Sequence, residues 1–352
     1  MKRVLFVASL PTKKMCFDGE RNKSRDVLNA IKKMGEAKID IIDYSKNKYL
    51  QTVKLIIKSF FKKYDFIFVS KCIVGGSLAI HLIHLFKKQR GKVFFYLIGN
   101  GYDGFEQKKI YFEDIAKCRH LIVESPIVAD SMVKKGNDQK QISVFPCIKP
   151  NYDLDVLEKK YPVNGPLRII YFSRINRHKG LDDLLDVVIR INEESKTTKF
   201  VLDVSGGVSN EPETIQFNKE VIETCSKYSY LNYIGLSLKI DGQGSYKRLQ
   251  QYDLHVFPSK FVQECAPGAI LDMFVAGIPT LSSTFPSYKF LLNVDNSFFF
   301  EQNNKEDLYN KLIYIYDNQK ELEQRRFKSH DEYFKYTETT FVKLLNNIGF
   351  DL

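Results

Sequence analysis

The feature that most constrains the fold is an alternation of strand-like and helix-like segments along the chain. Apolar runs typical of buried strands occupy residues 3–9, 64–71, 92–101, 167–174 and 199–206. Segments with helical spacing of apolar residues separate them, as in residues 24–35, 180–195 and 213–228. Strands that alternate with helices form βαβ units, so the sequence predicts an α/β fold with parallel sheets covered by helices.

One polar stretch interrupts this alternation near the middle of the chain. Residues 147–166, CIKPNYDLDVLEKKYPVNGP, contain three prolines and a glycine and precede a fresh apolar run. Such a segment is typical of a linker, and 352 residues are enough for two domains. We therefore expect an N-terminal domain over 1–155 and a C-terminal domain over 165–334. Ligands of open α/β sheets bind at the carboxyl ends of the strands.

Composition excludes several classes of protein. Hydrophobic residues make up 44% of the chain and charged residues 27%, as in a globular protein, and no apolar run is long enough for a membrane span. The first apolar run is too short for a signal peptide and fits a first buried strand. The six cysteines form no C-x-x-C pair, which argues against a zinc site or a disulfide framework and favours a reducing cytoplasm.

Charge is distributed unevenly between the two halves. Residues 1–150 contain 29 Lys and Arg against 14 Asp and Glu, whereas residues 151–352 contain 24 against 28. A basic half suggests a polyanionic partner, which could be nucleic acid, an anionic membrane surface or a phosphorylated substrate. An A+T-rich genome, which raises the lysine content of all its proteins, would be a neutral explanation of the same excess.

Two cations follow the first strand of the second half. The segment IIYFSRINRHKGLDDLLD places Arg174 directly after the strand and Lys179 just before a helix. An Arg fork and a Lys ammonium at the mouth of one strand suit an anion of high charge such as a diphosphate. Taken alone, both residues fit solvated loop positions equally well. The acids of LDDLLD are expected to lie on an exposed helix face.

A second segment, ECAPGAILDMFVAGIP, predicts a loop followed by a helix start. Pro267 suits the first helical turn, and Gly268 and Ala269 would present backbone N–H groups at a helix N-terminus, which favours anions. Glu264 precedes this helix and Asp272 lies within it. Carboxylates repel phosphate, so we expect these two to accept hydrogen bonds from hydroxyl groups of the same ligand.

These two segments together resemble the C-terminal signatures of family 4 glycosyltransferases, which are retaining nucleotide-sugar enzymes of the GT-B fold. YFSRINRHKGLDDLL is similar to that family's R…KG segment, and HVFPSKFVQECAPGAILDMFVAGIPTLSS to its P-S…E-x7-E…G-x-P segment. The resemblance implies two Rossmann-like α/β/α domains facing across a deep cleft, with a C-terminal helix over 335–352 returning to the N-terminal domain. It also points to enzymes of bacterial capsule and lipopolysaccharide biosynthesis.

The resemblance assigns roles to particular residues. Arg174 and Lys179 match the residues that bind the donor diphosphate and stabilise the leaving group. Glu264 matches the acid that contacts the transferred sugar, and it completes the expected catalytic set. Asp272 stands where the family has a Glu that holds the ribose hydroxyls. The loops VSGG and YIG, with Gly206 and Gly235, resemble those around the nucleotide base.

The resemblance gives less for the first half of the chain. Gly19 matches the glycine-bearing loop before the first helix, which lies over the reaction centre in that family. Where many members place a His near the transferred sugar, this chain has IGNGYDG, so Asn100 or Asp103 would substitute. No essential metal and no cofactor are expected. His81 and His84 have ligand-like spacing, but their apolar helix favours a structural role.

The expected function is transfer of a sugar, such as a hexosyl group, from a nucleotide-diphosphate sugar to a lipid-linked or oligosaccharide acceptor. Residues 77–92 combine an apolar stripe with a basic end, and Lys54, Lys58, Lys62 and Lys63 recur nearby at helical spacing. This pattern fits a cytoplasmic protein docked peripherally on the anionic inner face of the membrane. A helix buried in the first domain would explain residues 77–86 equally well.

Three other functions compete with this one. A catalytically inactive nucleotide-sugar or glycan-binding protein of the same fold would not need leaving-group cations. A nucleic-acid-binding protein would leave the paired acids unexplained, and no zinc, RNP or helix-turn-helix signature occurs. A non-hydrolysing sugar-nucleotide epimerase shares the two-domain form but is not expected to carry both segments.

Overall fold

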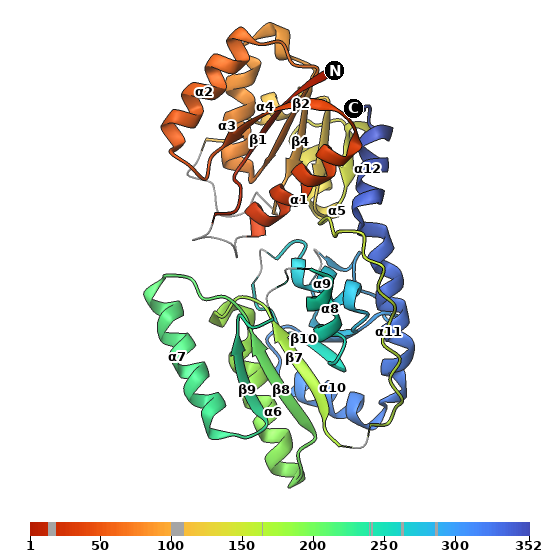
Figure 1. The fold of residues 1–352 in the computed structure, drawn as a ribbon. Helices are drawn as coiled ribbons and strands as arrows, with labels where there is room; N and C mark the ends of the chain where they lie inside the picture. Colours follow the sequence, from red (N-terminus) through yellow and green to blue (C-terminus); the bar gives the residue numbers. More distant parts are fainter. Residues whose placement is uncertain are drawn as a thin grey trace. The chain divides into compact units, whose positions relative to one another are not determined.

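The computed structural model describes residues 1–12, 19–99, 109–163, 165–238, 240, 242–261, 264–285 and 288–352. The chain forms two compact units (Figure 1), the first from Met1–Asn151 with Tyr336–Leu352 and the second from Tyr152–Lys335. Each unit contains a parallel six-stranded sheet with helices on both faces. The α/β class expected from the alternating pattern is confirmed.

The first unit has strand order β2-β1-β3-β4-β5-β6. Its strands are β1 (Lys2–Ala8), β2 (Ala37–Asp43), β3 (Phe66–Lys71), β4 (Val93–Leu97), β5 (His120–Val123) and β6 (Ile142–Val144). Its helices are α1 (Gly19–Met34), α2 (Lys48–Phe61), α3 (Ile73–His84), α4 (Phe112–Ile115), α5 (Pro126–Lys134) and α12 (Glu338–Asn347), with short 3-10 turns at Lys87–Gln89 and Gln139–Gln141.

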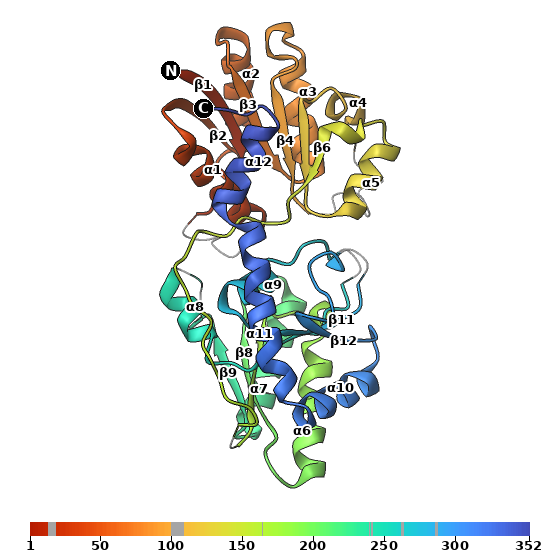
Figure 2. The same cartoon turned by 90° about the vertical axis from the view of Figure 1, so that its right-hand side faces the viewer.

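The C-terminal helix packs in this first unit, on the face of the sheet that α1 also covers (Figure 2). Phe341 and Leu345 of α12 are fully buried in the same core as strand residues of β1, β3 and β4. Phe350 follows α12, and its ring packs edge-to-face against Phe68 and Phe94. Aromatic burial of this kind anchors the end of the chain to the first sheet.

The second unit has strand order β12-β11-β10-β7-β8-β9. Its strands are β7 (Leu167–Phe172), β8 (Phe200–Ser205), β9 (Leu231–Gly235), β10 (Leu254–Phe257), β11 (Thr280–Ser283) and β12 (Ser297–Phe300). Its helices are α6 (Leu181–Ser195), α7 (Pro212–Lys227), α8 (Gln243–Leu249), α9 (Gly268–Ala276), α10 (Lys305–Asp317) and α11 (Lys320–Tyr333). A 3-10 turn, η3 (Arg177–Lys179), precedes α6, and another, Phe334–Tyr336, follows α11.

Central strands of both sheets are apolar on both faces, which explains the unbroken apolar runs of the sequence. Every residue of β3 and of β10 is buried. In the second unit, α6, α7 and α10 cover one face of the sheet with a continuous apolar core. Helices α8, α9 and α11 pack together in the same unit. All strands run parallel, so the loops that follow them gather at one edge of each sheet.

Of the helices in the described residues, none combines the length and the apolar character that crossing a bilayer needs.

Candidate active site

The loop after β7 fixes both predicted cations at the carboxyl edge of the second sheet. Tyr171 donates its hydroxyl to the Arg174 carbonyl oxygen at 2.7 Å, while the Arg174 side chain is exposed. Asn176 caps the following turn by accepting a hydrogen bond from the Lys179 backbone N–H at 3.1 Å. The loop thus leaves the guanidinium in solvent and directs the lysine inward.

Gly180 lets this loop approach the loop after β10. Its φ of 69° lies in the left-handed region, and a Cβ at this position would overlap the Pro258 carbonyl oxygen. Only glycine meets both conditions without strain. The Lys260 N–H also donates to the His178 carbonyl oxygen at 2.8 Å. The two loops are therefore held in contact by backbone geometry.

Lys179 and Glu264 form a buried ion pair at this contact. The Lys179 ammonium binds a carboxylate oxygen of Glu264, and the side chains are only 5% and 11% exposed. Ser259 donates to the same oxygen at 3.0 Å. The ammonium also lies over the rings of Phe257 and Phe261, 5.6 and 5.3 Å from their centroids. Two of the three predicted catalytic residues are therefore in direct contact.

Burial lowers the pKa of the Lys179 ammonium, and the charge and hydrogen bond of Glu264 oppose that shift. Arg174 is close enough for its positive charge to lower this pKa further. Within the described chain, no carboxylate lies within ion-pair distance of the Arg174 guanidinium. Two cations and one carboxylate thus share this edge, and the excess positive charge favours an anionic ligand.

Helix α9 begins immediately after this cluster. Pro267 is its N-cap residue and provides no side-chain cap, so the first N–H groups at Gly268 and Ala269 receive no oxygen from it. A Cβ added to Gly268 would meet nothing within 4 Å. The surrounding protein would therefore tolerate a larger side chain at this position, and the open space is available to a ligand.

Asp272 is buried on α9 and already has a protein partner. Its carboxylate accepts a hydrogen bond of 2.7 Å from the hydroxyl of Tyr246 on α8. The Tyr246 ring is itself buried and lies 5.3 Å from that of Tyr152. A buried carboxylate needs such a donor. The pair fixes the orientation of the acid predicted to hold ribose hydroxyls.

Gly206 and Gly235 bind neighbouring loops together. The Gly206 N–H donates to the Gly235 carbonyl oxygen at 3.0 Å, and Ser205 donates its hydroxyl to the same oxygen at 2.9 Å. A Cβ at Gly206 would overlap the Ser173 carbonyl oxygen. Close packing between the β7 and β8 loops therefore explains this glycine, and its predicted contact with a nucleotide base stays a prediction.

In the first unit, Gly19 is the first residue of α1 and is exposed, with nothing near its Cβ position. Asn100 and Asp103, the predicted substitutes for the family's His, lie outside the described residues. His81 and His84 both contact Asp114 through Nδ1, at 2.7 and 3.4 Å. Across the described ranges, no cluster of three or more potential metal-ligating side chains occurs.

Sequence reasoning missed two charged pairs at the carboxyl edge of the first sheet. Lys71, the last residue of β3, binds Ser9 at 2.8 Å and Glu20 at 3.4 Å. Glu124 follows β5, is fully buried, and pairs with Lys23 of α1. The sequence does carry a signal for both pairs, because Lys71 and Glu124 are charged residues at the ends of apolar strands.

Glu124 also orders the start of the next loop, since it accepts the Gly99 N–H at 2.9 Å. Burial raises the pKa of the Glu124 carboxyl, and the charge of Lys23 opposes this shift. An acid of this kind at the carboxyl edge of a parallel sheet, where α/β folds commonly bind ligands, is a candidate functional residue.

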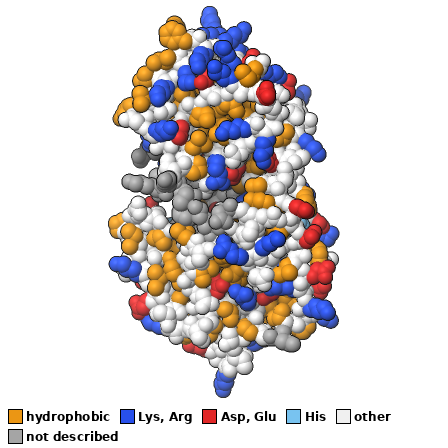
Figure 3. Space-filling view, viewed as in Figure 1, with side chains coloured by type: hydrophobic (Ala, Val, Ile, Leu, Met, Phe, Trp, Pro, Cys, Tyr) orange, Lys and Arg blue, Asp and Glu red, His pale blue; other side chains and the backbone are white. Residues whose placement is uncertain are grey.

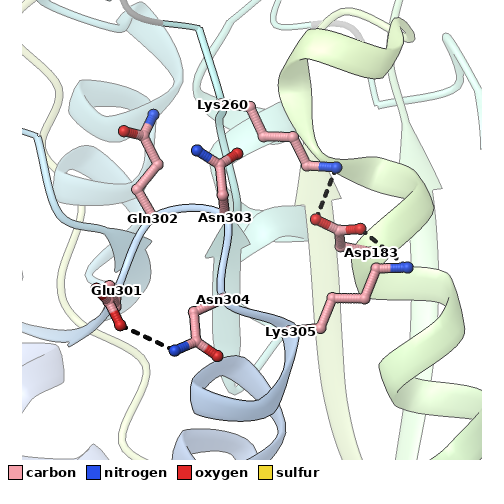
Figure 4. Close-up of a pocket in the computed structure, with 7 residues that line it drawn as sticks. All are labelled: Asp183, Lys260, Glu301, Gln302, Asn303, Asn304 and Lys305. Atoms are coloured by element: carbon pink, nitrogen blue, oxygen red, sulfur yellow. Dashed lines mark hydrogen bonds and ion pairs between the residues drawn. The ribbon is translucent and has the colours of Figure 1, made fainter.

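A polar cavity of about 520 Å³ in the second unit shares Lys260 with the contact between the loops after β7 and β10, and is lined by Asp183, Lys260, Glu301, Gln302, Asn303, Asn304 and Lys305. In Figure 4, Lys260 and Lys305 reach the two oxygens of Asp183 from different elements, at 2.7 and 3.1 Å. The expectation of an exposed acidic face on α6 is therefore wrong for Asp183, because this acid is buried between two lysines. The residues that line the cavity include none of the predicted donor-site residues.

Residues 155–330, half of the chain, match the family model described as glycosyl transferases group 1. No curated protein sequence matches the chain significantly. Among solved structures, Anabaena HepE in complex with UDP is similar with a TM-score of 0.74, 12% identity and 99% of both chains covered.

Two further solved structures cover nearly the whole chain. The lipopolysaccharide outer core galactosyltransferase WaaB in its apo form has a TM-score of 0.69 and 15% identity over 98% of both chains. Sucrose-phosphate synthase from Thermosynechococcus elongatus has a TM-score of 0.69 and 12% identity over 99% of this chain and 98% of that one. At such identities the likeness concerns the fold.

Two parallel α/β sheet units of this kind define the GT-B class of glycosyltransferases, and these neighbours share that fold. The protein belongs to the glycosyl transferases group 1 family and is a glycosyltransferase.

Proposed function

We propose that this protein transfers a sugar from a nucleotide-diphosphate sugar to an acceptor hydroxyl with retention of anomeric configuration. The observation that carries the proposal is the Lys179–Glu264 pair, buried beside the N-terminus of α9 at the carboxyl edge of the second sheet. This pair belongs to the half of the chain that matches the family model. HepE has been solved in complex with UDP, with UDP-glucose, and with UDP and glucose, which supports a nucleotide-sugar donor here.

The proposed reaction concentrates negative charge on one group. The bond between the sugar C1 and the diphosphate oxygen breaks, and its electron pair stays on the diphosphate. The acceptor oxygen forms a new bond to C1 on the same face, and its proton passes to a departing phosphate oxygen. The products are a glycoside and a nucleoside diphosphate.

Arg174, Lys179 and the N–H groups at Gly268 and Ala269 would stabilise the departing diphosphate. Donors aimed at the site where charge develops are the largest source of rate in many enzymes. Glu264 would hold Lys179 in place and accept sugar hydroxyls, while Asp272, fixed by Tyr246, would accept ribose hydroxyls. The proposal includes no essential metal, so turnover should persist in excess chelator.

On the acceptor side we propose a lipid-linked glycan of cell-surface polysaccharide, such as capsule or lipopolysaccharide. The protein would act in the cytoplasm at the inner face of the membrane. The excess positive charge of residues 1–150 supports this location. Gly19, Asn100 and Asp103 remain the candidates for contact with the transferred sugar or the acceptor.

A donor panel tests the proposal directly. UDP-, GDP-, dTDP- and ADP-sugars are screened by thermal shift, since a ligand that binds only the folded protein stabilises it more the further its concentration exceeds its dissociation constant. The stabilising donor is then incubated with lipid-linked acceptors, and release of nucleoside diphosphate is followed. Stabilisation by one donor and acceptor-dependent release are expected, with the anomeric configuration of the product read by NMR. If no nucleotide sugar stabilises the protein, the proposal fails; binding without turnover would favour an inactive sugar-nucleotide-binding protein.

A further inference from the structure

Helix α2 of the first unit turns most of its large apolar side chains toward solvent. Its buried residues are Gln51, Leu55 and Ser59, two of which are polar. The exposed apolar residues of this helix, with Tyr49 at 87% and Phe61 at 75%, are Tyr49, Leu50, Val53, Ile56, Ile57, Phe60 and Phe61. Packing in the first unit therefore does not account for the apolar character of the helix.

These seven residues, which we call the α2 face, form one continuous stripe. Their spacing of three and four residues places them on one side of a helix. In Figure 3, hydrophobic side chains follow the outline at the upper left, where Figure 1 shows α2. The stripe continues past the helix, because the Phe60 ring lies 5.8 Å from that of Phe86, next to the exposed Leu85. An exposed patch of this kind marks an interaction surface.

In the two segments that form and flank the α2 face, every charged residue is basic. Residues 46–63 contain six lysines and no acid, and residues 85–92 contain four cations and no acid. Asp40 pairs with Lys58 and Lys62, so the four lysines expected from sequence do not act alike. Lys54 and Lys63 remain exposed beside the apolar residues.

We propose that the α2 face is the surface by which this protein docks on an anionic lipid bilayer. A helix with a wide apolar face and flanking lysines lies in the membrane interface, where lysine heads reach the anionic headgroups. A second copy of this chain would bring two sets of unbalanced lysines together. The inference rests on the proposed lipid-linked acceptor and names the surface that would bring the protein to it.

Vesicle co-sedimentation with two sets of variants tests this docking. The triple variant Val53→Ser/Ile57→Ser/Phe61→Ser removes apolar contacts, and Lys54→Glu/Lys63→Glu reverses two charges. The matched controls lie on α7 of the other unit: Ile215→Ser/Ile222→Ser, at positions each 42% exposed, and Lys219→Glu.

The wild type should bind vesicles of phosphatidylglycerol and phosphatidylcholine at low salt, and bind pure phosphatidylcholine more weakly. Both the apolar triple variant and the double charge-reversal variant should lower the partition coefficient of the protein onto vesicles at least about tenfold, whereas the controls should not. Equal binding of wild type and triple variant, or no binding of the wild type, would overturn the inference. The inference would also be overturned if the wild type sedimented as a dimer without vesicles and the triple variant sedimented as a monomer.

Calorimetry with UDP, GDP, dTDP and ADP separates this outcome from the proposed function. The α2-face variants should bind these nucleotides as the wild type does. Loss of vesicle binding with intact nucleotide binding concerns the α2 face alone. Vesicle binding without affinity for any nucleotide would count against the proposed function and leave the docking surface standing.

Discussion

At the residue scale, the most informative feature is a lysine that is both buried and paired. The Lys179 side chain is buried, whereas that of Arg174 is exposed, and Glu264 balances the charge of Lys179. Breaking one partner of a buried pair leaves an uncompensated charge, which is costly. The same ammonium is proposed to face the leaving group, so substitution should affect both stability and rate.

Lys179→Met keeps most of the stem and removes the charge. We expect turnover to fall by roughly a thousandfold and the free energy of unfolding by about 3 kcal/mol, because Glu264 loses its partner. Both are measured below the unfolding temperature of the variant. Arg177→Met is the control, since its pair with Glu220 is half exposed and should contribute less than about 1 kcal/mol. Retained turnover in Lys179→Met would remove the leaving-group assignment.

His255 on β10 provides a pH-dependent stability term. Its Nδ1 lies 3.1 Å from the Thr280 hydroxyl, and its Nε2 has no hydrogen-bond partner among the described residues. Burial lowers its pKa from 6.5 to about 3. The unfolded chain therefore binds a proton that the folded protein rejects at pH values between these two.

Because the folded pKa is depressed, this stabilising contribution is complete above about pH 6.5 and is lost as the pH falls toward 3. Between about pH 7 and about pH 5 the wild type should lose roughly 2 kcal/mol more unfolding free energy than His255→Gln does. Denaturant titrations at the two pH values measure the difference. If the unfolding free energy of both proteins depended on pH in the same way, His255 would take up its proton equally in the folded and unfolded states, and its pKa would not be depressed by burial.

At the scale of elements, the site is built from loops that follow strands β7, β8, β9 and β10. Gly180 and Gly268 lie in two of these segments for different physical reasons. Gly180 has a positive φ and no room for a Cβ, whereas a Cβ on Gly268 would enter open space. This contrast gives a matched pair of substitutions.

Gly180→Ala should destabilise the protein by at least about 2 kcal/mol, because strain in the left-handed region adds to the overlap with Pro258. Gly268→Ala should leave stability unchanged or slightly raised, since alanine favours a helix. It should nevertheless weaken nucleotide binding, because the methyl group would enter the space assigned to the diphosphate. Thermal unfolding and calorimetry check both; unchanged nucleotide affinity in Gly268→Ala would exclude that helix start as the phosphate site.

Much of this element-level picture could be predicted from sequence. Arg174, Lys179 and Glu264 each follow an apolar strand, and parallel strands end at one edge, so their convergence was expected. The direct pairing of Lys179 with Glu264 does not follow from sequence, because 85 residues separate the two and no local pattern links them. Asp183 was placed on an exposed face because helical spacing cannot show lysines arriving from other elements.

The α2 segment shows the opposite limit. Its apolar residues at helical spacing would ordinarily indicate a buried helix. The membrane prediction therefore uses only the lysines of this segment and takes its apolar stripe from residues 77–92. In the structure Ile73, Ala79, Ile80 and Ile83 of α3 are buried, and the exposed stripe belongs to α2. Hydrophobic periodicity gives the width of an apolar face, but only packing decides whether that face is covered.

At the scale of the whole molecule, the two halves divide their charge as they divide their proposed tasks. The basic half carries the α2 face and the ion pairs Lys71–Glu20 and Lys23–Glu124. The other half carries the donor-site residues. A bilayer anchor on one unit and a nucleotide site on the other would let a water-soluble donor reach a lipid-linked acceptor.

Nucleoside diphosphate binding, measured by titration calorimetry, tests the central claim most directly. At least one of UDP, GDP, dTDP and ADP should bind the wild type. The Arg174→Ala and Lys179→Met variants should each weaken that affinity at least about tenfold, with Arg177→Met unchanged. Equal affinity in all four proteins, or no binding of any nucleotide, would contradict the claim that these two cations hold the donor diphosphate.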